Sequence, residues 1–354
     1  MRRGKLPVLS LILLLSVAVL FFASGPAYSQ TKEKPTQLSF SNFWPPAFGL
    51  SVESVKWADE IEKLTGGRVK ITIHHGGTLT TGPNCYEGVL TGISDIGQAP
   101  LQYTRGRFPL MEALDLPGYP LNGIVTTRIA NDIYNKFKPK ELAGVHVLYL
   151  HAHLPGVFYT AKKQIRTLED FKGLRFRATG QAANLITALG ATPIPVTKND
   201  EYEAMKKGVL DGTLGTPVSF ISWKIGDIAK YATVVPKAGY ITTFFVVMNA
   251  KKWHSLPPDI QKVFTEASDE WIERSGKAWN AVDTEGAQAS KKIGFNWIIP
   301  DAKEAARWEK ALEPIYSNYE KAMQSKGLPG TEVLEYRRQL IEKYAAVYQP
   351  LKWW

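Results

Sequence analysis

The sequence predicts an α/β protein with two lobes, and three observations lead to this prediction. Its 354 residues are too many for one ordinary hydrophobic core. Within residues 36–74, apolar and polar residues first alternate as in a strand, then apolar residues recur at helical spacing, and then the alternation returns. The phrase Gly-Val-Leu-x-Gly occurs at 88–92 and at 208–212, each time where a predicted helix turns into a strand. Two such phrases, about 120 residues apart, indicate two similarly built lobes.

An aromatic loop follows the first predicted strand. The strand covers 37–41, and the loop contains Phe43 and Trp44. A helix over 51–64 and a strand over 68–74 complete a β-α-β unit. The carboxyl end of a strand is where open α/β sheets place their ligands. The two aromatic side chains therefore either line a pocket or pack beneath the loop, and both readings stay open.

The segment 167–180 carries the main candidate for ligand binding. It reads T-L-E-D-F-K-G-L-R-F-R-A-T-G, a short helix followed by a half-buried strand. The end of that strand delivers Arg177 and Thr179, a guanidinium and a hydroxyl. A guanidinium is suited to a planar, bidentate hold on a carboxylate. The alternative is that Arg175 and Arg177 are solvated strand residues.

Two histidines end the apolar strand predicted over 145–153. His151 and His153 stand two residues apart and would share one strand face. Three interpretations of this pair are open: ordinary strand-end residues, residues that line a ligand site, or a pair of metal ligands. The neighbouring sequence supplies no further metal ligands, so no metal site is predicted.

Three other aromatic residues are candidates for the pocket. Tyr103 follows the first Gly-Val-Leu-x-Gly phrase. Trp223 either forms a pocket wall or packs in a helix. Phe244 lies in an uncharged strand predicted over 239–249, where the core is the simpler assignment.

A long helical pattern without proline covers 259–292. At 1.5 Å per residue it would be roughly 45–50 Å long, which is more than one small lobe needs.

The first 29 residues are typical of a signal peptide. A basic start precedes an apolar run over 8–23, and small residues at 27 and 29 favour cleavage near Ser29–Gln30. No later segment is long and apolar enough to span a membrane. Export is therefore expected.

Composition and motifs exclude several function classes. The single cysteine, Cys85, rules out an intramolecular disulfide. The net charge of +10 includes three basic residues within 1–29, and the remaining +7 is dispersed, so nucleic-acid binding is not predicted. No nucleophile elbow, phosphate loop, zinc-protease motif or dinucleotide fingerprint occurs. We predict neither an enzyme nor a cofactor.

Segment 167–180 resembles the L-K-G-L-K-I-R-x-P/T signature of the solute receptors of tripartite ATP-independent periplasmic (TRAP) transporters, the DctP-like family. The A-L-G-A-T-P-I-P-V run at 188–196 and the L-D-G at 210–212 also match, and the resemblance covers roughly 36–345. In that family the last arginine of the signature binds the ligand carboxylate, and Arg177 is the matching position.

The resemblance implies a periplasmic binding protein type II-like fold, with a hinge, an interlobe ligand cleft and a long lobe-bridging helix. The expected first lobe is 36–153 plus 244–283. The expected second lobe is 154–243 plus 284–350.

The resemblance also implies a function. A monomeric periplasmic receptor would capture an organic acid and deliver it to a small DctQ-like and a large DctM-like membrane subunit. Sialic-acid-type receptors carry a second arginine about 20 residues earlier, which 154–159 lacks, and Thr216 stands near the place of the family's Asn contact. An aromatic or branched monocarboxylate is therefore favoured. The alternatives are a partner of a membrane sensor and the receptor of an ATP-driven (ABC-type) importer.

Overall fold

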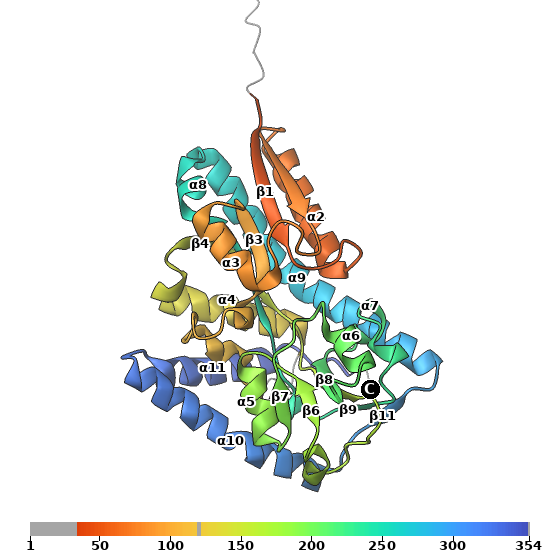
Figure 1. Cartoon of the computed structure of the whole chain (residues 1–354). Helices are drawn as coiled ribbons and strands as arrows, with labels where there is room; N and C mark the ends of the chain where they lie inside the picture. Colours follow the sequence, from red (N-terminus) through yellow and green to blue (C-terminus); the bar gives the residue numbers. More distant parts are fainter. Residues whose placement is uncertain (1–33, 119–121, 353–354) are drawn as a thin grey trace, which may run out of the picture. The chain divides into compact units, whose positions relative to one another are not determined.

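Two mixed β-sheets organise the chain from Thr36 onward in a computed structural model (Figure 1). The structure describes residues 34–118 and 122–352, so the predicted signal peptide at 1–29 lies outside the described residues. In sheet order, the first sheet contains β2 (Val69–His74), β1 (Thr36–Asn42), β3 (Ile96–Pro100), β10 (Thr243–Asn249) and β4 (Val145–Ala152). The second contains β11 (Asn296–Ile298), β9 (Tyr231–Thr233), β5 (Val157–Thr160), β8 (Gly212–Gly215), β6 (Arg175–Arg177) and β7 (Thr192–Ile194).

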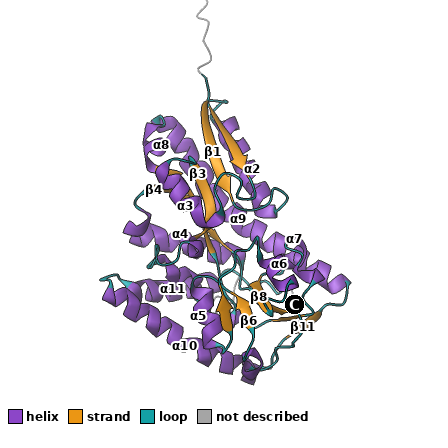
Figure 2. Cartoon of the chain, in the orientation of Figure 1, coloured by secondary structure: helices purple, strands orange, loops and turns teal. Residues whose placement is uncertain are grey.

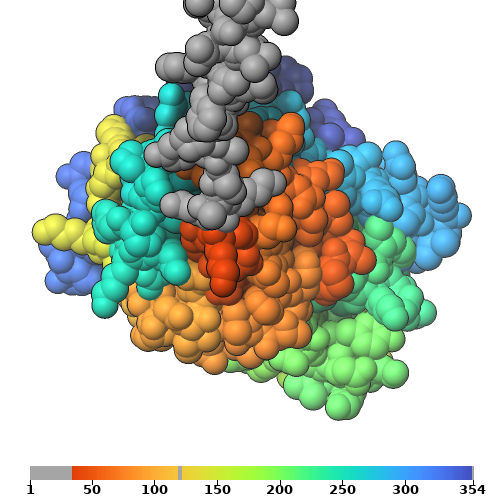
Figure 3. Space-filling view, turned by 90° about the horizontal axis from the view of Figure 1, so that it is seen from above, coloured from red at the N-terminus to blue at the C-terminus, as the bar shows by residue number. Residues whose placement is uncertain are grey.

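The strand β10 ties distant parts of the chain together in the first sheet. It runs antiparallel between β3 and β4, whereas β1 pairs in parallel with β2 and β3. Figure 3 shows residues near 36–100 beside residues near 245–260. In the second sheet β6 pairs in parallel with both β7 and β8. The carboxyl end of β6, where Arg177 lies, is therefore set between two neighbouring strands.

Helices cover both sheets (Figure 2). They are α2 (Gly49–Leu64), α3 (Cys85–Thr91), α4 (Gly123–Phe137), α5 (Gln181–Ala188), α6 (Glu201–Lys206), α7 (Ser219–Ser222), α8 (Ala250–Ser255), α9 (Pro258–Lys292), α10 (Ala302–Ser325) and α11 (Gly330–Ala345). Within the described residues, no helix combines the length and the apolar composition needed to cross a membrane.

The predicted long helix is confirmed as α9, which has 35 residues. It packs on α2, α4 and β4 near the first sheet and on α7 near the second. Two glycines allow the close contacts: a Cβ on Gly276 would lie 2.5 Å from Ile124 Cα, and one on Gly286 would lie 2.2 Å from the Pro217 carbonyl oxygen. The helix therefore braces both sheets, which confirms the two-lobed α/β fold.

The chain crosses between the sheets three times, after β4, after β9 and along α9. The terminal helix α11 packs against α4, and Tyr344 donates a hydrogen bond to Asp132 at 2.6 Å. The range expected for the second lobe, 154–243 plus 284–350, therefore ends in α11, although this helix contacts α4 beside the first sheet. The exact lobe boundaries stay a prediction.

Candidate functional site

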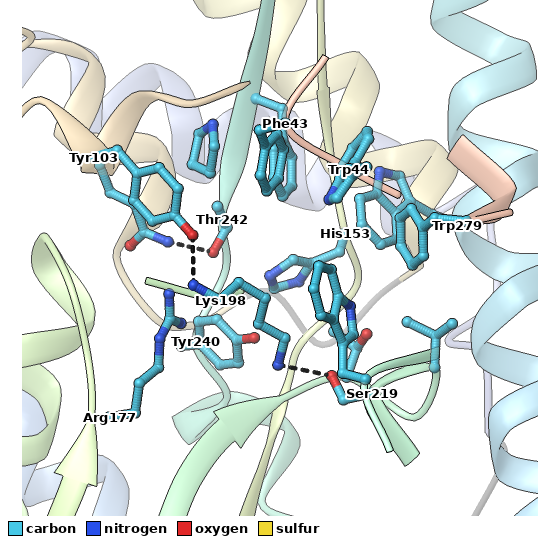
Figure 4. Close-up of a pocket in the computed structure, with 17 residues that line it drawn as sticks. Phe43, Trp44, Tyr103, His153, Arg177, Lys198, Ser219, Tyr240, Thr242 and Trp279 are labelled. Atoms are coloured by element: carbon cyan, nitrogen blue, oxygen red, sulfur yellow. Dashed lines mark hydrogen bonds between the residues drawn. The ribbon is translucent and has the colours of Figure 1, made fainter. Parts of the chain in front are cut away.

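Arg177 ends β6 and is nearly buried. Phe176 is fully buried on one face of the sheet, so Arg177 projects from the other face. Arg177 is 4% exposed, and its Nε donates a hydrogen bond to the Val196 carbonyl oxygen at 2.9 Å. Among the described residues none accepts a hydrogen bond from its two terminal nitrogens. Figure 4 shows the guanidinium turned into a cavity.

Arg175, at the other end of β6, has a different environment. Its Nε lies 2.9 Å from Asp211 Oδ2 and its Nη2 lies 3.0 Å from Oδ1, which is a bidentate surface ion pair. Its side chain is 44% exposed. The reading of a solvated strand arginine therefore applies to Arg175 and not to Arg177.

Lys198 is a second cation at the cavity. It follows β7 and precedes Glu201, the first residue of α6, by three positions. Its Nζ lies 2.9 Å from Glu201 Oε1, 2.8 Å from Oε2 and 3.2 Å from Ser219 Oγ. The pKa of Lys198 is lowered overall. Burial is the largest cause, the nearby charge of Arg177 adds to it, and the Glu201 carboxylate opposes it.

Glu201 lies behind both cations. Its side chain has no exposed area, and Oε2 is also 3.8 Å from Arg177 Nε. One buried carboxylate thus stands against two cationic side chains, and Arg177 and Lys198 are the charged residues among the described lining of the cavity. We call Arg177, Lys198, Thr216 and Ser219 the cationic wall. By formal charge, two cationic side chains and one carboxylate leave one positive charge in excess.

Aromatic side chains form the opposite wall. Phe43 and Trp44 follow β1, Phe244 lies in β10, and their rings contact one another with centroids 4.8–6.1 Å apart. Trp279 of α9 completes the wall, 5.5 Å from the Phe244 ring, and Phe48 lies 5.0 Å from Trp44. We call Phe43, Trp44, Phe48, Phe244 and Trp279 the aromatic wall. All five are buried and belong to one hydrophobic core cluster.

The cavity between the walls measures about 50 Å³. A single water needs roughly 10–15 Å³ on this measure, so the cavity suits a compact ligand. Its lining is Phe43, Trp44, Phe48, Pro100, Gln102, Tyr103, His153, Arg177, Lys198, Thr216, Val218, Ser219, Trp223, Tyr240, Thr242, Phe244 and Trp279. Eight residues expected at the ligand are present: Phe43, Trp44, Tyr103, His153, Arg177, Thr216, Trp223 and Phe244.

Two expected residues do not line the cavity. The strand β6 ends at Arg177, so the strand face no longer fixes the direction of Thr179, whose buried Oγ1 has no partner among the described residues. His151 lies in β4, behind the aromatic wall. Its Nδ1 accepts from Trp279 Nε1 at 3.0 Å, and its Nε2 lies 2.9 Å from Gln98 Nε2.

The histidines are neutral near pH 7. Burial lowers the pKa of His153 to about 3, and the cations Lys198 and Arg177 lower it further. Its Nδ1 donates to the Leu154 carbonyl oxygen at 2.6 Å. Burial, with a contribution from His153, also lowers the pKa of His151 to about 3. In the described part of the chain, no cluster of three or more histidine, cysteine or acidic residues could hold a metal ion.

Sequence reasoning missed Lys198, Tyr240 and Trp279. Lys198 precedes three polar residues and resembles a solvated helix start. Trp279 belongs to the apolar stripe of the long helix, which does not distinguish a cavity wall from the core. Tyr240 lies before β10 in a crossing segment that was expected to be strand. No local sequence pattern marks Lys198, because the burial of its partner Glu201 becomes visible only in the fold.

Hydrogen bonds connect the first-sheet and second-sheet sides around the cavity. The Lys198 backbone N–H donates to the Tyr103 hydroxyl at 2.9 Å (Figure 4). Outside the cavity, Gln181 Nε2 donates to Glu112 Oε2 at 2.6 Å. Both bonds join the 101–115 segment to the second sheet, so the cavity is closed on this side.

Comparisons with known proteins agree with this geometry. The family model DctP, described as bacterial extracellular solute-binding protein, family 7, matches residues 40–322. Among curated relatives, the C4-dicarboxylate-binding periplasmic protein DctP of Rhodobacter capsulatus is 24% identical over 299 residues. The match covers 80% of this chain and 86% of that protein.

Solved structures of TRAP solute-binding proteins share the fold. One from Rhodoferax ferrireducens, in complex with copurified benzoate, has a TM-score of 0.84 and 28% identity, covering 88% of this chain and 99% of that chain. One from Bordetella bronchiseptica, with bound (R)- and (S)-mandelate, has a TM-score of 0.82 and 27% identity, covering 88% and 100%. The expectation that this chain is a receptor and not an enzyme is confirmed. It belongs to the DctP family of bacterial extracellular solute-binding proteins.

Proposed function

We propose that this protein is an exported receptor that captures a compact aromatic or branched monocarboxylate and presents it to the small and large TRAP membrane subunits. The observation that carries the proposal is the guanidinium of Arg177, whose terminal nitrogens are free and face an aromatic cavity. Buried charges are normally paired, so a carboxylate is the group that this cavity lacks.

The two walls would hold the two ends of such a ligand. Arg177 would bind the carboxylate through two parallel, charge-assisted hydrogen bonds. The aromatic wall would cover the organic body, because ring faces and edges favour apolar and aromatic groups. Tyr103, His153, Thr216 and Trp223 would complete the enclosure.

The small closed cavity favours a ring or short branched chain over a sugar acid. Similar structures contain benzoate or mandelate, which supports a monocarboxylate with an aromatic ring. Two curated relatives are named for C4-dicarboxylates, at 24% and 26% identity, and one from Nostoc is named for monocarboxylate 2-oxoacids, at 23%. A dicarboxylate would need a second anion site, whereas both cationic side chains lie on one wall and the opposite wall is apolar.

The decisive experiment is isothermal titration of the mature protein, without residues 1–29, with a panel of small mono- and dicarboxylates. We expect a monocarboxylate to bind and Arg177→Ala to weaken it by roughly 100-fold or more. Arg175→Ala is the matched control, since Arg175 pairs with Asp211 outside the cavity, and it should leave the affinity unchanged. Full affinity in folded Arg177→Ala would overturn the site, and binding of dicarboxylates alone would overturn the ligand class.

A further inference from the structure

The charge balance of the cavity depends on three side chains rather than on Arg177 alone. Lys198 and Glu201 form a close buried pair, and Glu201 is farther from Arg177, at 3.8 Å from Nε. Because the carboxylate is nearer to Lys198, the charge of Arg177 is the less compensated one. The inference below concerns this balance and rests on the proposed function.

Lys198 faces the cavity, although it is held from behind. Glu201 and Ser219 accept from Nζ, and an ammonium group has three donors. The side chain is 13% exposed and lines the cavity, so the ammonium group lies at the cavity surface. The Trp223 ring lies 5.7 Å from Nζ and limits the space in which the ammonium can move.

Burying unbalanced charge is costly, and the cost falls when opposite charges are equal in number. Two cations and one carboxylate leave a charge of +1. A monoanion brings this set to zero, a neutral molecule leaves +1, and a dianion produces −1. We propose that Lys198, held by Glu201, is a specificity-determining residue that sets the cavity to accept one negative charge.

The test compares three ligands that share one organic body and differ in the charge of their head group. The probes are the tightest monocarboxylate of the panel, its amide and its phosphonate analogue; for benzoate these are benzamide and phenylphosphonate. All measurements use one alkaline pH, where the phosphonate is a dianion and the Asp283 carboxyl behind Thr216, with its pKa raised to about 7 by burial, carries the same charge in every variant. Affinities are measured by titration calorimetry for wild type, Glu201→Gln, Lys198→Met and the double variant. Circular dichroism and thermal melting establish that each variant is folded.

Each variant changes the charge of the set in a known way. Glu201→Gln raises it to +2, and we expect the affinity ratio of phosphonate to carboxylate to rise at least about tenfold. Lys198→Met lowers it to zero, and the carboxylate should lose about 100-fold while the amide changes much less. The double variant returns it to +1 with Arg177 alone, and should regain most of the lost carboxylate affinity.

A purely structural role for Lys198 gives a different pattern. All three probes would then weaken equally in Lys198→Met, and the double variant would bind no better. If Lys198→Met does not fold, Glu201→Gln decides, because glutamine keeps the shape and the acceptor toward Lys198. An unchanged phosphonate-to-carboxylate ratio in Glu201→Gln overturns the inference. Failure of wild type to bind any monocarboxylate would instead overturn the proposed function.

Discussion

The two walls of the cavity differ in what holds them in place. The aromatic wall belongs to the main hydrophobic core, and its rings contact one another as closely as side chains elsewhere in the interior. The cationic wall is made by the end of a short strand, a loop and a four-residue helix. Its side chains are fixed by hydrogen bonds and by the ion pairs of Glu201 with Lys198 and Arg177, and its charge is unbalanced.

This difference separates stability from recognition. Ligand pockets usually combine a large apolar lining with few polar groups that orient the ligand. Here the apolar lining is also part of the core, so its removal affects the folded state itself. The polar groups contribute little packing, so their removal affects mainly the bound state. The following substitutions test this separation, from the largest expected effect to the smallest.

Trp44→Ala should lower the free energy of unfolding by about 3–5 kcal/mol, because a buried aromatic side chain leaves a cavity. Trp44 is 2% exposed and lies against five rings. These rings belong to Phe43, Phe48, His151, Phe244 and Trp279. Urea unfolding measures the change. Trp223→Ala, in a half-buried position, is the control and should cost clearly less. Equal costs would mean that the aromatic wall is not part of the stabilising core.

Arg177→Lys should weaken monocarboxylate binding by about 30-fold, or ~2 kcal/mol, and leave the free energy of unfolding nearly unchanged. Lysine keeps the positive charge but loses the planar fork and the Nε donor to Val196. Titration calorimetry and urea unfolding give the two quantities on the same sample. A large loss of stability with unchanged affinity would reverse the roles assigned to the walls.

Asp115→Asn should flatten the pH dependence of stability in the window that ends near pH 8. Asp115 Oδ1 accepts from the Thr243 N–H at 2.8 Å, at the start of β10. Burial raises the pKa of Asp115 from 3.8 to about 8, so the folded state holds this proton where the unfolded state has lost it. The stability that this proton supplies is present below pH 3.8 and is lost as pH rises through about 8.

Thermal and urea unfolding between pH 6.5 and 8 measure this effect, which amounts to at most ~1.4 kcal/mol per pH unit. In this range the histidines, with pKa values lowered from 6.5 to about 3, contribute little change. Burial raises the pKa of Asp283 to about 7, and this carboxyl adds a slope of the same sign in both proteins. Identical pH profiles for wild type and Asp115→Asn would contradict the assignment.

Tyr103→Phe should speed ligand release several-fold, corresponding to about 1 kcal/mol. The lost hydroxyl accepts from Lys198 N–H and joins the two sides of the closed cavity. Stopped-flow displacement measures the release rate. The control is Tyr86→Phe, which removes a hydroxyl bonded to the Glu141 carbonyl oxygen at 3.3 Å, away from the cavity. The same release rate in both variants would mean that the Tyr103 bond does not hold the cavity closed.

The sequence predicts the fold well because the relevant signals are local. The strands, the long helix and the strand-end position of Arg177 all follow from periodicity within one element. The question whether Phe43, Trp44 and Phe244 belong to the core or to the pocket has no single answer. In a closed cavity the same side chain is buried and also lines the space.

The two expected residues that do not line the cavity, His151 and Thr179, lie near the ends of strands. His151 and His153 were expected on one face, but β4 ends at Ala152, so the alternation that relates them is interrupted. Thr179 likewise follows the end of β6 at Arg177. Lys198 was missed for a non-local reason: its burial depends on α6, α7 and the Tyr103 segment meeting around it. The periodicity within one element carries no information about contacts between elements that are distant in the sequence.

The helix α9 touches both walls within one turn. Trp279 lines the cavity, and Asp283, four residues later, accepts from the Val218 N–H at 2.8 Å and so holds the segment before α7. An unbroken helix of 35 residues is about 52 Å long. The same rod packs on α2, α4 and β4 near the first sheet and on α7 near the second, so one rigid element carries part of the aromatic wall and anchors the segment behind the cationic wall.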